Sequence, residues 1–265
     1  MDANIQFYYP KNRQRLAIFV TKEFAPLYDL LIKHQSGELA CEIPCVISNH
    51  EDLSEIASQF SIPYHHFSVS TSTKAEQEEL INKLMEDEKI DLLVLARYMQ
   101  VLSNEFVAKY QVKIINIHHG FLPAFKGKSP YRQAWERGVK MIGATAHYVT
   151  KELDEGPIIE QETIRVNHSM TPEILTEMGK DIESMVLSKS IKLHCEKRIF
   201  INDKNIHFSH STSVAGGLQR TSVSPLGRQT VNAVPPVVPR AAKAKHSVKI
   251  SAFSHSVVTR PHHIK

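Results

Sequence analysis

The chain has 265 residues, of which 42% are hydrophobic and 23% charged, so it is long enough to bury the core of one large domain. Its net charge of +4 is uneven: residues 209–265 hold eight lysines and arginines and no acidic residue, which leaves a net −4 for residues 1–208. Three cysteines without a Cys-x-x-Cys spacing exclude a disulfide framework, and no apolar run approaches the roughly 18 residues of a membrane span.

The first half of the chain alternates predicted strands with predicted helices. Short aliphatic runs predict strands at residues 16–20, 43–48, 65–69, 92–95 and 114–118. Helical patterns separate them at residues 26–33, 52–60, 73–88 and 104–110. In the third of these helices we place Leu80, Ile81 and Leu84 on one apolar face. This alternation is typical of a parallel sheet built from strand–helix–strand units.

The pattern continues beyond residue 120 with longer elements. Ser129 and Pro130 read as the N-cap and first residue of a helix that ends at Gly138. Two strands follow at residues 141–149 and 158–166, a long helix runs from Thr171 to about Leu193, and a hairpin joins residues 198–201 to 206–208. We therefore predict an α/β fold: a doubly wound, mostly parallel sheet with flanking helices.

Residues 209–265 differ in character from the rest of the chain. Serine, histidine, proline, valine and basic residues dominate, without periodicity and without a carboxylate. Such a segment cannot bury enough surface to offset its ordering entropy, so we predict a disordered basic tail. Its charge could attract nucleic acid or an anionic membrane, but an extension without function is the favoured interpretation.

Three polar side chains form the candidate active site. Asn116 and His118 lie on the strand 114–118, whose three isoleucines indicate burial on both faces, and alternation points both side chains to the same side. Asp154 lies in the loop 153–157 between two later strands. An amide donor, an imidazole and a carboxylate suit attack on a formyl or acyl carbon through a tetrahedral intermediate.

Other histidines nearby are weaker candidates. His119 faces away from His118, which indicates a supporting structural role. His147, on the strand that leads to Asp154, is as readily explained as a core histidine as by membership of the site. No His-x-x-x-His pair or comparable ligand spacing is present, so we predict no metal.

Three ordered motifs carry a family resemblance over residues 15–208. They are Asn116-Ile117-His118, the Phe-Leu-Pro-Ala-Phe-Lys-Gly loop at 121–127 and the Leu-Asp-Glu-Gly-Pro loop at 153–157. Together they resemble the folate-dependent formyltransferase superfamily. Within it, the double histidine at 118–119, the segment 143–149 (Gly-Ala-Thr-Ala-His-Tyr-Val) and the segment 95–102 (Leu-Ala-Arg-Tyr-Met-Gln-Val-Leu) resemble the formyltetrahydrofolate deformylases.

The resemblance implies an activity and a role for each residue. Deformylases hydrolyse 10-formyltetrahydrofolate to formate and tetrahydrofolate, which supplies formate for purine synthesis and balances one-carbon pools. Asn116 would hold the formyl oxygen, His118 would protonate the departing N10, and Asp154 would position water and take its proton. The resemblance also implies a folate pocket lined by Tyr98, Met99, Gln100, Val101, Leu102, Leu153 and Glu155.

The main alternative is formyl transfer to glycinamide ribonucleotide. That enzyme family binds a phosphate in a Gly- and Ser-rich loop after the first strand, whereas residues 21–26 here contain no glycine and add a carboxylate, Glu23. Water is therefore the expected acceptor. A methionyl-tRNA formyltransferase would need a further C-terminal domain with its own core, and a folate-binding protein without catalysis would not need all three site residues.

The resemblance also predicts the domain organisation. Deformylases usually begin with a regulatory domain of the ACT type, and residues 1–14 resemble only its last strand. We therefore predict a remnant strand at 1–14, a catalytic domain at 15–208 and the tail at 209–265. The expected partners are a folate substrate and water, with no cofactor, nucleic acid or membrane. The expected location is the cytoplasm, and a homo-oligomer is left open.

Overall fold

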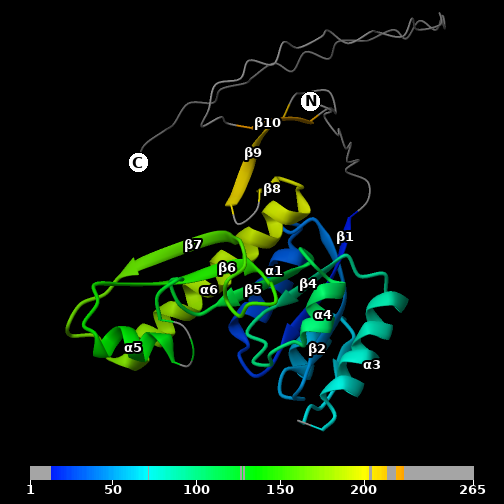
Figure 1. Cartoon of the computed structure of the whole chain (residues 1–265), viewed down its shortest axis with the longest axis horizontal. Coiled ribbons are helices and arrows are strands. Elements are labelled where there is room, and N and C mark those ends of the chain that lie inside the picture. Colours follow the sequence, from blue (N-terminus) through cyan, green and yellow to red (C-terminus); the bar gives the residue numbers. More distant parts are fainter. Residues whose placement is uncertain are drawn as a thin grey trace, which may run out of the picture. The chain divides into compact units, whose positions relative to one another are not determined.

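The computed structural model of the chain describes residues 13–70, 72–125, 127, 129–202, 205–213 and 219–223. All the described residues lie within residues 1–224, and their helices and strands are labelled in Figure 1. The predicted remnant strand at 1–14 lies outside this part except for its last two residues, and so does most of the predicted tail.

A seven-stranded sheet forms the centre of the described part, in the order β3-β2-β1-β4-β5-β6-β7 (Figure 1). The first five strands pair in parallel, while β6 is antiparallel to both β5 and β7. The strands are β1 (Gln14–Val20), β2 (Cys41–Ser48), β3 (Tyr64–His66), β4 (Leu92–Leu95), β5 (Ile114–His118), β6 (Met141–Tyr148) and β7 (Ile158–Arg165). The predicted doubly wound, mostly parallel sheet is confirmed.

Helices cover both faces of this sheet. They are α1 (Ala25–Gln35), α2 (Ser54–Gln59), α3 (Lys74–Asp87), α4 (Asn104–Lys109), α5 (Pro130–Glu136) and α6 (Pro172–Cys195). Along β1, Leu16, Ile18 and Val20 pack in one core with α1, α2 and α6, while Ala17 and Phe19 pack in another with α3 and α4. Burial on both faces explains why these strands are continuous aliphatic runs.

Local details differ from the sequence prediction in three places. Leu80 is 55% exposed, because the buried face of α3 runs through Ile81 and Met85 instead. Ser129 adopts a left-handed conformation and makes no side-chain cap bond, although Pro130 does begin α5. The third strand is shorter and earlier than predicted, since only residues 64–66 pair with β2.

A small antiparallel sheet follows the long helix. It consists of β8 (Ile199–Asn202), β9 (Asn205–Ser213) and β10 (Gln219–Val223). Residues 209–213 and 219–223 therefore form strands within the segment predicted to be disordered, and there the prediction was wrong. This small sheet packs on the core through Ile206 and Phe208 of β9, a long-range contact that composition does not reveal. No helix of the described part is long and apolar enough to cross a membrane.

Candidate active site

The strand β5 delivers two of the predicted residues to the carboxyl edge of the sheet. Ile114, Ile115 and Ile117 are buried and anchor the strand, while Asn116 and His118 alternate with them. The strand order reverses between β1 and β4, and β5 lies next to β4. Ligands of open α/β sheets bind beside such a reversal, outside the carboxyl ends of the strands.

The loop after β6 brings Asp154 to the same place. A Cβ on Gly156 would lie 1.8 Å from the carbonyl oxygen of Tyr148, so only glycine lets the loop fold this closely onto the strand. Asp154 itself adopts a positive φ of 57°. Its Oδ2 lies 3.3 Å from Nδ1 of His118, and its Oδ1 lies 3.7 Å from Nε2 of His147. The expected convergence of the carboxylate with the β5 pair is observed.

The electrostatics of the site favour an ionised Asp154. Hydrogen bonding to His118, the largest contribution, holds the pKa of the Asp154 carboxyl well below its usual value, against the effect of burial. The His118 side chain is only 5% exposed, and its Nε2 has no hydrogen-bond partner in the described part of the chain. A Cβ on Gly120 would lie 3.1 Å from that nitrogen. Nε2 is therefore the atom of His118 that remains for a proton-transfer partner.

His147, which the sequence left open as a core or a site histidine, contacts Asn116, and its role in the site stays a prediction. It pairs with Asn116 across β5 and β6, and its Nε2 lies 3.2 Å from Nδ2 of Asn116. Its Nδ1 lies 2.9 Å from the carbonyl oxygen of Tyr148, which can only accept, so Nδ1 carries the proton of the neutral ring. Nε2 then accepts from the Asn116 amide and fixes which way this amide points.

His119 contacts both His118 and Tyr131, and its supporting role stays a prediction. Its ring centroid lies 5.5 Å from that of His118 and 6.3 Å from that of Tyr131. Burial lowers the pKa of His119 to about 3, with a smaller contribution from the positive charge of Arg97. The ring is therefore neutral at physiological pH.

Three buried polar residues beside His119 were missed by sequence reasoning. The Arg97 guanidinium lies 3.5 Å from the Glu183 carboxylate, and the Tyr131 hydroxyl donates to the other Glu183 oxygen at 2.7 Å. One signal was present: in α6, Glu183 lies on a stripe of buried positions that includes Ile182 and Val186. A carboxylate on a buried helix face needs a partner, and this could have pointed to the cluster.

Comparison with known proteins identifies the family. The sequence profile of the Formyl transferase family matches residues 14–191. A formyltetrahydrofolate deformylase of Synechocystis sp. is 47% identical over 203 residues, which are 77% of this chain and 71% of that protein. The chain belongs to the formyltetrahydrofolate deformylase family.

Solved structures agree with this membership. A formyltetrahydrofolate deformylase from Pseudomonas syringae superposes with a TM-score of 0.73 at 43% identity, covering 74% of this chain and 66% of that one. A glycinamide ribonucleotide transformylase from Symbiobacterium toebii shares the fold at 26% identity, with a TM-score of 0.71 over 78% of this chain and 98% of its own. The chain spans about two thirds of the length of the deformylases that it matches.

The residues expected to line a folate pocket have different surroundings. Among them, the structure exposes the apolar side chains of Met99, Val101 and Leu153. Tyr98 instead points into the core, where its ring meets that of Phe19 edge-on at 5.4 Å. Gln100 and Leu102 are half-buried and Glu155 is exposed. That these residues bind folate stays a prediction.

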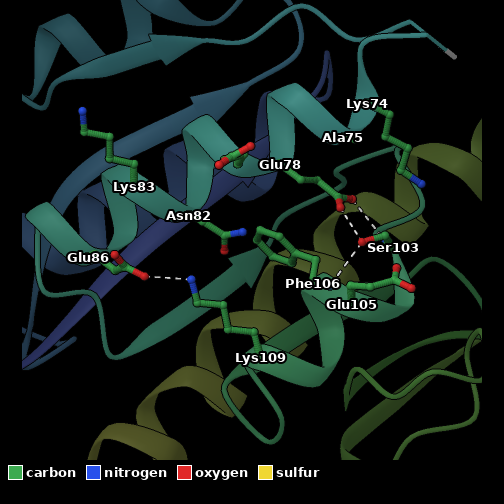
Figure 2. A pocket seen from close by; sticks show the side chains of 11 residues that line it. Lys74, Ala75, Glu78, Asn82, Lys83, Glu86, Ser103, Glu105, Phe106 and Lys109 are labelled. Carbon is green, nitrogen blue, oxygen red and sulfur yellow. Dashed lines mark hydrogen bonds and ion pairs between the residues drawn. The ribbon is translucent and has the colours of Figure 1, made fainter.

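A separate groove of about 840 Å³ lies between α3 and α4 (Figure 2). Glu78 and Ser103 bind each other across it, and Glu86 forms an ion pair with Lys109 at 2.8 Å. None of the proposed catalytic residues lines this groove. Within the described residues, no group of three or more His, Cys, Asp or Glu side chains is arranged to hold a metal ion.

Proposed function

We propose that this chain hydrolyses 10-formyltetrahydrofolate to formate and tetrahydrofolate, as the names of its deformylase relatives indicate. The observation that carries the proposal is the contact between Asp154 and His118 beside Asn116, in a chain that is 47% identical to a deformylase. This places a carboxylate, an imidazole and an amide donor around one point at the carboxyl edge of the sheet. These are the groups that water attack on a formyl carbon requires.

Asn116 is the proposed donor to the formyl oxygen. Of its two amide hydrogens, one is directed to Nε2 of His147, 3.2 Å away, and the other remains for the substrate. The bond to His147 prevents rotation of the amide, which would otherwise present its carbonyl oxygen to the oxyanion. A donor fixed in advance stabilises the developing charge without reorganisation during the reaction.

His118 and Asp154 share the proton transfers of the proposed reaction. The water oxygen forms a bond to the formyl carbon, its proton passes to Asp154 directly or through His118, and the carbon–N10 bond then breaks. N10 takes a proton from Nε2 of His118, and a water proton held by Asp154 returns to His118 through Nδ1. The second water proton passes to solvent as the product leaves as formate. The low pKa of Asp154 means that this carboxylate stabilises the imidazolium form of His118 when it arises.

Formyl transfer to glycinamide ribonucleotide is the alternative, since transformylases share the fold. One observation favours hydrolysis. In the loop after β1, where a phosphate-binding loop would be rich in glycine, Glu23 is mostly buried and forms an ion pair with Lys180 at 2.8 Å. A phosphate entering there would meet a carboxylate whose cationic neighbour is already engaged.

The remaining expectations belong to the same proposal. We infer that the reaction needs no cofactor, that its partners are the folate substrate and water, and that it takes place in the cytoplasm. Three cysteines without disulfide bonds in the described part fit a reducing compartment. The division into a remnant strand at 1–14, a catalytic region at 15–208 and a tail remains a prediction.

Formate release distinguishes hydrolysis from transfer. The protein is incubated with 10-formyltetrahydrofolate, with and without glycinamide ribonucleotide, and both formate and formylated nucleotide are measured. We expect formate at the same rate in both reactions and no formylated nucleotide. Turnover that depends on the nucleotide would overturn the proposal.

A further inference from the structure

Buried polar atoms without a hydrogen-bond partner concentrate beside the proposed catalytic trio. Such atoms are rare in folded proteins, so a concentration of them needs a reason. Of the nine atoms of this kind in the described residues, five belong to the carboxyl edge of the sheet or to the helix that packs there: Glu23 Oε1, Arg97 Nε and Nη1, His118 Nε2 and Glu183 Oε2.

Arg97 lies just beyond the end of β4, close to the histidine that follows His118. Leu95, the last residue of β4, pairs with Asn116 on β5, and the charge of Arg97 acts on His119, whose ring centroid lies 5.5 Å from that of His118. The backbone turns at Arg97 with a φ of 63°. The side chain of Arg97 is only 17% exposed, and the Glu183 carboxylate that faces it at 3.5 Å is 1% exposed.

Two residues of α6, Gly179 and Glu183, fix the position of Tyr131 beside this ion pair. A Cβ on Gly179 would lie 2.1 Å from the Tyr131 ring, so glycine leaves the space in which that ring lies. One turn later on the same face, Glu183 accepts the hydrogen bond of the Tyr131 hydroxyl at 2.7 Å. Glu183 therefore has a fixed position from which it orients the Arg97 guanidinium.

The cluster occupies the part of the site where a molecule that accepts the formyl group would bind. The donor reacts at β5, where Asn116 and His118 lie, which leaves the ends of β1 and β4 for the molecule that accepts the formyl group. At those ends the cluster has two cationic side chains, Arg97 and Lys180, and two carboxyl side chains, Glu23 and Glu183. This balance provides no excess positive charge for a phosphate.

We propose that Arg97, positioned by Glu183 and Tyr131, determines the acceptor by filling the space beside the formyl carbon, so that water reaches it and a larger amine does not. The proposal rests on the hydrolytic function proposed above. It makes Arg97 a specificity-determining residue, and Glu183 a positioning residue that acts through it.

The two competing reactions differ only in the nucleophile. In hydrolysis, water oxygen bonds to the formyl carbon, the carbon–N10 bond breaks, one water proton ends on N10, and the other is released to solvent, giving formate and tetrahydrofolate. With a primary amine, the amine nitrogen forms the bond instead, loses one proton and leaves as a formamide, while N10 again gains a proton. Neither reaction needs an oxidant or a reductant.

The test uses glycinamide, a phosphate-free primary amine, together with 10-formyltetrahydrofolate. The ratio of formylglycinamide to formate is measured for the full chain and for two variants of Arg97. Arg97→Ala opens the space, whereas Arg97→Met removes the charge but still fills it. Arg132→Ala is the matched control, because the Arg132 side chain is 72% exposed and paired only with a surface glutamate.

We expect Arg97→Ala to raise the ratio at least about tenfold, the lower end of what one pocket contact discriminates, while Arg97→Met and Arg132→Ala stay near the unsubstituted protein. An unchanged ratio in a folded, formate-releasing Arg97→Ala protein would overturn the role of Arg97 and leave the hydrolase function standing. An equal rise in Arg97→Met would show that charge, and not volume, excludes amines, and would also overturn it.

Two further measurements separate the possible failures. An unsubstituted protein that releases no formate would refute the hydrolase function itself, whatever Arg97 does. If the Arg97 variants do not fold, as judged by thermal unfolding, Glu183→Gln decides, because it keeps the volume and the Tyr131 contact but frees the guanidinium. We expect Glu183→Gln to raise the ratio above that of the unsubstituted protein, and no rise at all would contradict the positioning role.

Discussion

Gly156→Ala tests whether the loop after β6 positions the catalytic carboxylate. The added Cβ would lie 1.8 Å from the carbonyl oxygen of Tyr148, whereas real Cβ atoms essentially never approach within 3.0 Å, so the chain must move by about 1.2 Å. Asp154, two residues earlier, lies 3.3 Å from His118, so a small displacement of Asp154 would break this contact. A misplacement of about 1 Å costs on the order of 100-fold in rate, and overpacking costs about 1–3 kcal/mol in stability.

The assay is formate release under saturating 10-formyltetrahydrofolate, combined with urea unfolding of the same samples. Gly37→Ala is the control: Gly37 has a φ of 79° with no atom within 4 Å of the added Cβ, so it tests backbone strain without a clash. We expect that control to lose about 1 kcal/mol of stability and no activity. A Gly156→Ala protein with a rate within about threefold of the unsubstituted protein would refute the reasoning about this loop, since a 1 Å displacement should cost far more.

Three further predictions concern other contacts. Asp154→Asn should slow formate release by about 10²- to 10⁴-fold with folate binding retained in a fluorescence titration; near-normal turnover would remove Asp154 from the mechanism. Gly179→Ala should lower the free energy of unfolding in urea, because the added Cβ would clash with the Tyr131 ring. Helix propensity alone would raise this free energy by about 1 kcal/mol, so a net gain in stability would contradict the packing. Burial lowers the pKa of His194 from 6.5 to about 4 in the folded protein. Between these two pH values the unfolded chain binds more protons than the folded protein, so the free energy of unfolding falls as the pH drops from 6.5 to about 4. His194→Gln should flatten that part of the curve, and an unchanged slope would argue against the assignment.

The sequence by itself determined most of the sheet and the proposed catalytic trio. A continuous aliphatic run identified β4, because a strand buried on both faces has no polar side chains to alternate, and three isoleucines identified β5. Thr171 marked the start of α6, where its hydroxyl accepts from the backbone of Ile174. Alternation along β5 placed Asn116 and His118 on one side. These signals are local, since each depends on residues within a few positions.

Only the tertiary structure decided which distant side chains meet. The contact of His147 with Asn116 became visible once β6 paired with β5 and placed its ring there. The contact of Arg97 with Glu183 joins residues 86 positions apart, through the order of the strands and the packing of α6 on the sheet. Propensity and periodicity carry no information on such pairs, because their distance is set by how the elements pack and not by the residues beside them.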